Sequence, residues 1–223
     1  MKKAALFRKV APPKNKKAGD KMNLLIVGGF LGSGKTSILL KLARYIAGEN
    51  PEYMSKVVIV ENEIGEISVD DKVLSGFGAY SVTNMFSGCV CCTMSGELVS
   101  GLNQIQKDMN PELIILEATG VAFPHNIRET VKYSIPDANC RVCCVTDAKR
   151  WNRLLIPMGN LLPDQLDSAD VILINKVDTV PSETVDAVEQ SIRQFNDTAR
   201  YFRISAASEI APEVFEAVLG ERG

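Results

Sequence analysis

Nearly continuous apolar runs alternate with amphipathic stretches along the chain from residue 22 onward. Short runs of Val, Ile and Leu are typical of strands that are buried on both faces of a parallel sheet. We expect such strands at residues 23–28, 56–61, 112–117, 141–147, 170–175 and 200–205.

The stretches between these runs have apolar residues at helical spacing. Helices are expected at residues 34–47, 95–108, 125–133, 181–196 and 211–219. Regular strand–helix alternation predicts an α/β fold with a mostly parallel central sheet and helices on both of its faces. In such a sheet, ligands bind beyond the carboxyl ends of the strands, so the chemistry is expected in the segments that follow each strand.

The chain of 223 residues is long enough for one sizeable core. No apolar run approaches the roughly 18 residues that a membrane span requires. The basic N-terminus is not followed by the apolar stretch and small-residue cleavage site of a secretion signal. A cytoplasmic location is therefore expected, in which the six cysteines are reduced thiols available for metal or redox chemistry.

The net charge of −2 hides an asymmetry between the N-terminus and the remainder of the chain. Residues 1–21 hold eight basic side chains against Asp20 alone, so the remainder is acidic. We interpret residues 1–21 as a flexible basic arm and residues 22–223 as one globular domain. A solvated tail is the first interpretation of the arm. Contact with an acidic partner, a nucleic acid or its own acidic body is the alternative, with nucleic acid less favoured.

Residues 29–36 read Gly-Phe-Leu-Gly-Ser-Gly-Lys-Thr, a P-loop that lies between a predicted strand and a predicted helix. Glycines let successive backbone amides point at phosphate oxygens beside the positive end of the helix. Lys35 is expected to reach the β- and γ-phosphates, and the Thr36 hydroxyl to ligate Mg²⁺. This motif predicts a P-loop NTPase. The expected nucleotide contacts in this region are Gly29, Leu31, Gly32, Ser33, Gly34, Lys35, Thr36 and Ser37.

Base recognition is assigned to residues 175–178, Asn-Lys-Val-Asp, which close a buried strand. The Asp178 carboxylate can accept both the ring N–H and the exocyclic amine of guanine, a pair of donors that adenine lacks. Asn175 and Lys176 are expected to contact the nucleotide as well. Ser205 and Ala206 follow the last strand and fit a loop that offers backbone amides to the guanine carbonyl.

A fourth segment, residues 117–120 or Glu-Ala-Thr-Gly, follows another buried strand. Glu117 at the strand end is expected to face the P-loop and to hold Mg²⁺ directly or through water. The Gly120 amide can then sense the γ-phosphate. Lys35, Thr36 and Glu117 are thus the catalytic candidates. Intrinsic hydrolysis should be slow because no obvious arginine finger is present.

Five motifs in this order resemble the CobW-type GTPases, relatives of the HypB and UreG nickel chaperones. They are residues 29–36, 61–66 (Glu-Asn-Glu-Ile-Gly-Glu), 88–92 (Gly-Cys-Val-Cys-Cys), 117–120 and 175–178. The resemblance covers roughly residues 22–220 and implies slow GTP hydrolysis coupled to delivery of a metal or cofactor. It also implies that Glu117 stands where P-loop enzymes more usually have Asp. CobW-type proteins commonly add a C-terminal domain and often a histidine-rich stretch, whereas this sequence ends at Gly223 and has one histidine.

Cys89, Cys91 and Cys92 bring three soft ligands into four residues. Three thiolates leave a fourth coordination position open, which suits a carrier that must release its ion. The resemblance implies that these cysteines bind a transition metal and that Glu61 and Glu66 can contribute. Zinc and cobalt are the first expectations and copper(I) is also compatible with sulfur ligands. Without the resemblance, a buried apolar cluster or a redox site is the alternative.

A second cluster, Cys140, Cys143 and Cys144, lies within an expected strand and is interpreted as core. The segment 61–71 lies where a nucleotide-sensitive switch is expected, and it would couple the nucleotide to the metal site if it contacts the cysteine loop.

The leading functional hypothesis is a GTP-hydrolysing metallochaperone or insertase that uses Mg²⁺ with GTP and GDP and delivers a transition metal to a client protein. A GTPase that reactivates a partner enzyme, such as a corrinoid-dependent one, without carrying metal is the alternative. A nucleotide-gated binding module with negligible turnover is a third hypothesis. No membrane partner is expected, and analogy with relatives allows a homodimer.

Overall fold

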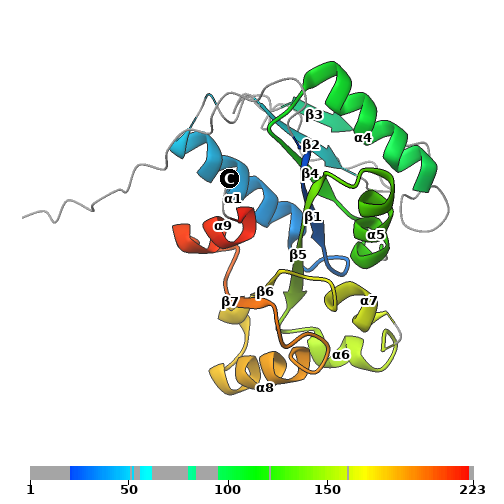
Figure 1. Ribbon diagram of the computed structural model, residues 1–223. Coiled ribbons are helices and arrows are strands. Elements are labelled where there is room, and N and C mark those ends of the chain that lie inside the picture. The colour runs from blue at the N-terminus through cyan, green and yellow to red at the C-terminus, as the bar shows by residue number, and fades with distance from the viewer. Residues whose placement is uncertain are drawn as a thin grey trace, which may run out of the picture.

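The computed structural model describes residues 21–50, 52, 56–61, 80–83, 95–120, 122–159 and 161–220. Within these residues, seven strands form one sheet in the order β3-β2-β4-β1-β5-β6-β7, and every neighbouring pair is parallel (Figure 1). The expected parallel α/β sheet is therefore confirmed. The strands are β1 (Asn23–Gly28), β2 (Val57–Glu61), β3 (Tyr80–Thr83), β4 (Leu113–Glu117), β5 (Asn139–Asp147), β6 (Val171–Asn175) and β7 (Arg200–Arg203).

Helices cover both faces of this sheet, and each face has its own apolar core. On one face, α1 and α9 pack against side chains such as Leu25 and Val27 of β1. On the other face, α4, α5, α6, α7 and α8 pack against Leu24 and Ile26 of the same strand. Because successive side chains of a strand point to opposite faces, one apolar strand supplies both cores. The helices are α1 (Lys35–Glu49), α4 (Ser95–Met109), α5 (Pro124–Ser134), α6 (Trp151–Leu155), α7 (Leu162–Leu166), α8 (Ser182–Ile192) and α9 (Pro212–Leu219), with the 3₁₀ turn η1 (Val177–Thr179).

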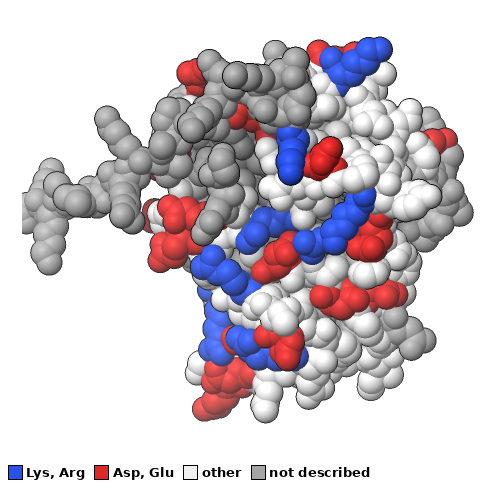
Figure 2. All heavy atoms as spheres, viewed as in Figure 1, with Lys and Arg blue, Asp and Glu red and all other residues white. Residues whose placement is uncertain are grey.

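Among the described segments, no helix has the length and apolar character needed to cross a bilayer. On the face shown in Figure 2, Lys and Arg side chains alternate with Asp and Glu across the described surface. This face lacks the single-sign basic surface that is typical of nucleic-acid binding.

Four of the described elements were not expected from the sequence: β3, α6, α7 and the short turn η1. The two helices have five residues each, too few for helical periodicity to be recognised. Two expected elements end earlier than predicted, since β7 ends at Arg203 and α8 ends at Ile192.

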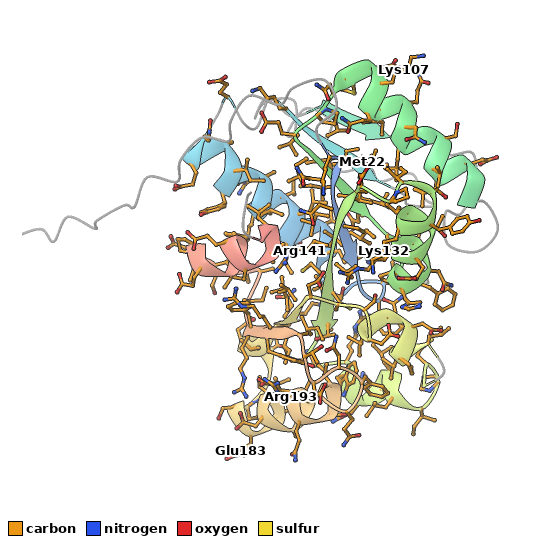
Figure 3. The ribbon with its side chains drawn as sticks, in the orientation of Figure 1. Met22, Lys107, Lys132, Arg141, Glu183 and Arg193 are labelled. Atoms are coloured by element: carbon orange, nitrogen blue, oxygen red, sulfur yellow. The ribbon has the colours of Figure 1, made fainter. Side chains whose placement is uncertain are left out.

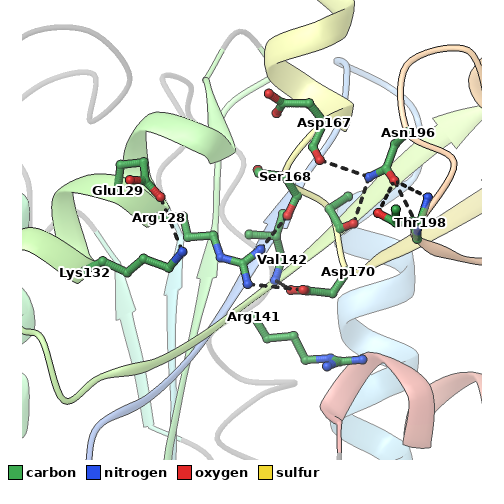
Figure 4. Close-up of polar contacts among 12 residues, drawn as sticks. Arg128, Glu129, Lys132, Arg141, Val142, Asp167, Ser168, Asp170, Asn196 and Thr198 are labelled. Atoms are coloured by element: carbon green, nitrogen blue, oxygen red, sulfur yellow. Dashed lines mark hydrogen bonds and ion pairs between the residues drawn. The ribbon is translucent and has the colours of Figure 1, made fainter.

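Asn196 gives a physical reason for the earlier end of α8. Its buried side-chain nitrogen donates to Leu166 O at 2.7 Å and Ala169 O at 2.9 Å. Its side-chain oxygen accepts the Thr198 and Ala199 amides at 3.0 and 2.9 Å (Figure 4). A side chain that bonds to nearby backbone groups in this way competes with helix continuation.

Arg128 of α5 fixes that helix to the start of β6 (Figure 4). Its guanidinium donates to Ser168 O at 2.6 Å and to Asp170 Oδ1 at 3.2 Å. The other oxygen of Asp170 accepts the Val142 amide of β5 at 2.8 Å. One carboxylate therefore connects a helix with two adjacent strands.

Arg141 of β5 makes the corresponding contact on the opposite face of the sheet, where it reaches the C-terminal end of α9 (Figure 3). Its side chain donates to Val218 O at 3.0 Å and to Ala217 O at 2.6 Å. The last carbonyls of a helix have no partner within the helix and carry partial negative charge, so an arginine there satisfies them and stabilises the helix end.

The second cysteine cluster is confirmed as core. Cys140 and Cys144 lie in the core on one face of the sheet and Cys143 in the core on the other, and all three are free thiols. Burial raises the pKa of Cys140 to about 11 and that of Cys144 to about 12, and it raises the pKa of Cys143 further. These groups act as small apolar side chains that remain protonated at neutral pH.

We expect these three thiols to be unreactive in the folded protein. In a variant with Cys89, Cys91 and Cys92 replaced by Ser, a disulfide thiol reagent at pH 8 should label no thiol until denaturant is added. In the folded protein the pKa of the Cys140 thiol is raised from its ordinary value of 9.0. Its contribution to the free energy of unfolding is therefore fully present below pH 9 and decreases as the pH rises toward 11. Rapid labelling of any of the three thiols without denaturant would contradict the assignment.

Candidate functional site

The P-loop connects the carboxyl end of β1 to the first turn of α1, and its glycines are required by two kinds of geometry. Gly29, Gly32 and Gly34 have φ angles of 130°, 72° and 101°, a region that side chains with a Cβ rarely adopt. A Cβ on Gly29 would lie 2.1 Å from Val145 O, and one on Gly34 would lie 2.4 Å from Asn175 Nδ2. The loop is thus packed directly against the ends of β5 and β6.

Three consecutive carbonyls of this loop accept hydrogen bonds from side chains of other segments. The pairs are Leu31 O with Arg150 Nη2, Gly32 O with Lys176 Nζ at 2.6 Å, and Ser33 O with Asn175 Nδ2 at 2.8 Å. A trans peptide directs its C=O and the following N–H to opposite sides. The amides of Gly32 and Gly34 therefore point away from the side chains that bond to Leu31 O and Ser33 O.

The first turn of α1 adds positive charge at the same place. Lys35 is buried with 7% of its surface exposed, and its ammonium lies 3.5 Å from Phe30 O. The first turn of α1 contains no acidic residue that would neutralise the positive end of the helix dipole. Thr36 and Ser37 belong to this turn. The loop, the lysine and the helix end together form an anion-binding concavity.

Thr36 and Glu117 are brought into direct contact, as the sequence predicted for a shared cation. Thr36 Oγ1 donates to Glu117 Oε1 at 2.8 Å. Glu117 ends β4, which pairs with β1 so that Glu117 lies opposite Val27, and only 8% of its surface is exposed. Adjacent ligands of an octahedral Mg²⁺ with bonds of 2.0–2.1 Å are about 2.9 Å apart. The spacing and chemistry of these two oxygens therefore fit two neighbouring positions of a Mg²⁺ shell.

Two buried hydroxyls lie in the same two segments, the P-loop and residues 117–120. Ser33 Oγ and Thr119 Oγ1 have no hydrogen-bond partner within the described residues. Leaving a buried hydroxyl unpaired costs about 1–3 kcal/mol, which the oxygens of a bound anion can offset. Gly120 lies against the loop so closely that a Cβ would be 2.5 Å from Leu31 N. The segment 117–120 is thus in contact with the P-loop, as expected.

Asn175 connects the P-loop with both segments that were assigned to base recognition. Its Oδ1 accepts the Ala206 amide at 2.8 Å while its Nδ2 donates to Ser33 O. The Ala206 amide, expected to face a guanine carbonyl, therefore bonds to Asn175 in this structure, beside the half-buried Ser205. Asp178 lies exposed in η1, two residues after Lys176.

Asp147 and Arg150 are site residues that the sequence reasoning missed. Asp147 ends β5 with 2% of its surface exposed, and its Oδ2 accepts Lys176 Nζ at 2.7 Å and Arg150 Nε at 2.9 Å. Burial raises the pKa of this carboxyl, but the hydrogen bonds and charge of Lys176 and the bonds from Arg150 outweigh burial and hold it below its ordinary value of 3.8. A carboxylate at the end of a buried strand was the signal that identified Glu117, and it applies equally to Asp147.

The proposed transition-metal ligands lie largely beyond the described residues. Cys89, Cys91, Cys92 and Glu66 are outside them, and for Glu61 only the backbone is described. That backbone ends β2 opposite Glu117 of β4. Within the described part of the chain, no group of three or more His, Cys, Asp or Glu residues is arranged to hold a metal ion. The cysteine site stays a prediction.

The close packing of the loop glycines predicts an asymmetry between glycine substitutions. Gly29→Ala should lower the free energy of unfolding by roughly 2–5 kcal/mol, since it combines an unfavourable φ with a clash against Val145 O. Gly48→Ala is the matched control, because Gly48 lies in α1 with open space around it, and it should raise stability by about 0.5–1 kcal/mol. Urea denaturation followed by circular dichroism measures both. Equal effects would contradict the described loop.

Known proteins are similar to this chain in sequence and in fold. It is 31% identical over 166 residues to the zinc chaperone YjiA of Escherichia coli, covering 69% of this chain and 48% of that protein. It is 27% identical over 226 residues to zinc-regulated GTPase metalloprotein activator 1 of Dictyostelium discoideum, covering 82% of this chain and 46% of that protein. The chain spans about half the length of the curated relatives it matches.

Two solved structures share the fold at low sequence identity. The hydrogenase maturation factor HypB of Archaeoglobus fulgidus has a TM-score of 0.61 and 16% identity, over 89% of this chain and 87% of that one. The cell division protein FtsY of Thermotoga maritima has a TM-score of 0.58 and 18% identity, over 97% of this chain and 73% of that one.

A family model extends across most of the described structure. Residues 23–203 match the nucleotide-binding domain of CobW/HypB/UreG, a span that runs from β1 to β7 and contains the P-loop, Glu117 and Asn175. The chain therefore belongs to the CobW/HypB/UreG family.

Proposed function

We propose that this chain binds GTP and GDP with Mg²⁺, hydrolyses GTP slowly, and couples its nucleotide state to binding and delivery of a transition metal. The observation that carries the nucleotide part is the convergence of the P-loop, the Thr36–Glu117 pair and the Asn175 side chain at one edge of the sheet. In this proposal residues 22–223 are the GTPase domain and residues 1–21 are a basic arm.

The phosphate groups of the nucleotide would occupy the concave side of the P-loop. There the amides of Gly32 and Gly34, the ammonium of Lys35 and the N-terminal end of α1 supply donors and positive charge. Thr36 Oγ1 and Glu117 would hold Mg²⁺, which when bound neutralises charge on the transferred phosphoryl group. Gly120 packs on Leu31, so a γ-phosphate that displaces either residue would shift the segment after β4.

Guanine selectivity is assigned to Asp178, which follows the segment that Asn175 and Lys176 attach to the P-loop. A carboxylate that accepts two guanine donors loses both with adenine, and each hydrogen bond to a charged group contributes about 1.5–3 kcal/mol. The Ala206 amide is bonded to Asn175, so its proposed contact with the base would require this hydrogen bond to be exchanged, and Ser205 lies beside it.

The nucleotide proposal is tested by titration calorimetry in the presence of Mg²⁺. GTP and GDP should bind, and ATP should bind at least tenfold more weakly. Asp178→Ala should weaken GDP binding by roughly 10- to 100-fold, because it removes charged hydrogen bonds to the base. Asp164→Ala, an exposed carboxylate of α7, is the matched control and should leave affinity unchanged. Equal binding of ATP and GTP by the unmodified protein would remove the proposal.

The metal part of the proposal is supported by the cysteine motif and by the names of relatives. Three thiolates in four residues favour a soft or borderline ion, and the relatives named zinc chaperones favour zinc over cobalt. The same relatives support delivery to a client protein. A metal carried on reduced thiols is consistent with a cytoplasmic location, which we infer for this function.

Coupling between nucleotide and metal is supported by the strand register. The ends of β2 and β4 are neighbours, with Glu61 opposite Glu117. Glu117 is a proposed Mg²⁺ ligand, and the chain continues from Glu61 toward Glu66 and the cysteines. Nucleotide-dependent movement at Glu117 would therefore act directly on the start of the segment that leads to the metal site.

Elemental analysis of anaerobically purified protein tests the metal proposal. The protein should carry a stoichiometric transition metal that Cys91→Ser abolishes, while Cys140→Ala retains it because Cys140 is a buried core thiol. Metal affinity should differ between the complexes with a GTP analogue and with GDP, since equal affinity means that no coupling exists. A metal-free protein that still binds GTP would instead favour a GTPase that acts on a partner without carrying metal.

A further inference from the structure

Asp147 and Arg150 anchor the P-loop independently of Asn175. We propose that Asp147 is a positioning residue, which holds Lys176 and Arg150 so that both donate to adjacent carbonyls of the P-loop and direct the loop amides at a phosphate group. This inference rests on the proposed nucleotide site and adds two residues, neither of which belongs to the P-loop or to the segment 175–178.

Asp147 is held in one orientation by its own backbone turn. Its Oδ1 accepts the amides of Lys149 at 3.0 Å and Arg150 at 3.2 Å, a local turn in which the side chain bonds to the residues that follow it. This contact directs the other oxygen, Oδ2, at Lys176 and Arg150. The lowered pKa of Asp147 keeps the carboxylate ionised at neutral pH, so both of its oxygens act as acceptors there.

The side chains of Lys176 and Arg150 each contact both Asp147 and the P-loop. The Lys176 ammonium lies 2.7 Å from Asp147 Oδ2 and 2.6 Å from Gly32 O, so a single nitrogen bridges the two. Arg150 uses Nε for Asp147 and Nη2 for Leu31 O. Long basic side chains lose rotamer freedom when they are ordered, and a buried carboxylate that already fixes them reduces that cost at the loop.

The loop backbone is shaped to receive the guanidinium. A Cβ on Gly32 would lie 3.0 Å from Arg150 Nη2 and 3.3 Å from its Nη1, so the guanidinium packs closely against Gly32 and would have to shift to admit a side chain there. With Leu31 O bonded on this side, the planar trans peptide directs the Gly32 amide to the opposite side. Arg150 therefore constrains the orientation of the Gly32 amide through Leu31 O.

Lys176 shows that the same anchor supports an uncommon backbone conformation. Its φ of 64° is in the left-handed region, which is unfavourable for a residue with a Cβ. Two hydrogen bonds at its ammonium, to Asp147 and Gly32, hold the side chain in place. Asp147 thus connects the segment for the base with the loop for the phosphates, while the base contact itself is assigned to Asp178.

Because Arg150 is assigned to the P-loop and Asp178 to the base, substitutions can separate the two roles. Arg150→Ala should weaken GDP and inorganic pyrophosphate binding by the same factor, about tenfold, and should leave the preference for GDP over ADP unchanged. Arg150→Lys should recover part of the loss, because it keeps the positive charge but lacks the two separate nitrogens with which the guanidinium contacts Asp147 and Leu31 O. Arg153→Ala, at an exposed arginine of α6, the helix that Arg150 precedes, is the matched control and should change neither affinity.

Asp147→Asn should exceed Arg150→Ala in its effect on both ligands, since it releases two cations. If Asp147→Asn does not fold, the arginine series alone decides the question. The inference is overturned if Arg150→Ala leaves GDP and pyrophosphate affinity unchanged. It is also overturned if Arg150→Ala abolishes the preference for GDP over ADP, because the substitution would then act on recognition of the base.

A nucleotide-free measurement keeps this inference distinct from the proposed function. In ¹⁵N NMR spectra of the ligand-free protein, the amide signals of Gly32 and Gly34 should shift in Arg150→Ala and stay in place in Arg153→Ala. Shifted loop amides in a protein that binds no guanine nucleotide would support the anchor and reject the proposed function. Unmoved loop amides in Arg150→Ala would reject the anchor whether or not nucleotide binds.

Discussion

The candidate site depends on the hydrogen bonding of three consecutive carbonyls in the P-loop. Leu31 O accepts a hydrogen bond from Arg150, which follows β5. Gly32 O and Ser33 O accept hydrogen bonds from Lys176 and Asn175 at the end of β6. A glycine-rich loop has high conformational entropy in isolation, so glycines alone do not define a binding surface. The loop is therefore ordered by side chains at the ends of β5 and β6, which lie outside the loop itself.

Parallel topology makes this arrangement possible. The strands β4, β1, β5 and β6 are adjacent and run in the same direction, so their carboxyl ends meet at one edge. Each strand end contributes a different chemical group: a carboxylate from β4, a glycine-rich loop from β1, a second carboxylate from β5 and an amide from β6. The two apolar cores, to which both the strands and the covering helices contribute side chains, hold these strand ends in place.

The sequence predicted those features that depend on local pattern. The strand at residues 23–28 was located correctly because its apolar run is bounded by polar residues and glycine. The expectation that Glu117 faces the P-loop followed from its place at a strand end, and the structure brings it into hydrogen-bond contact with Thr36. The assignment of Cys140, Cys143 and Cys144 to the core followed from their place within an apolar run.

The features that the sequence did not predict depend on distant contacts or on short segments. β3 has four residues and α6 has five, so neither has room for a periodic pattern. The role of Arg150 depends on its distance from Leu31, a residue far away in the sequence, and no local motif marks that contact. Similarly, α8 ends early because of contacts that Asn196 makes with the α7–β6 turn.

Burial of the three β5 thiols has a consequence for stoichiometry. In the proposed metal-carrying function, sulfur atoms outside the metal site must be kept from competing for the ion. Here the sheet does so by enclosing Cys140, Cys143 and Cys144 within its two cores, where the thiolate form is strongly disfavoured. Metal found on the folded chain therefore reports on cysteines elsewhere in the sequence, and denaturation would expose three additional ligands that distort the measured ratio.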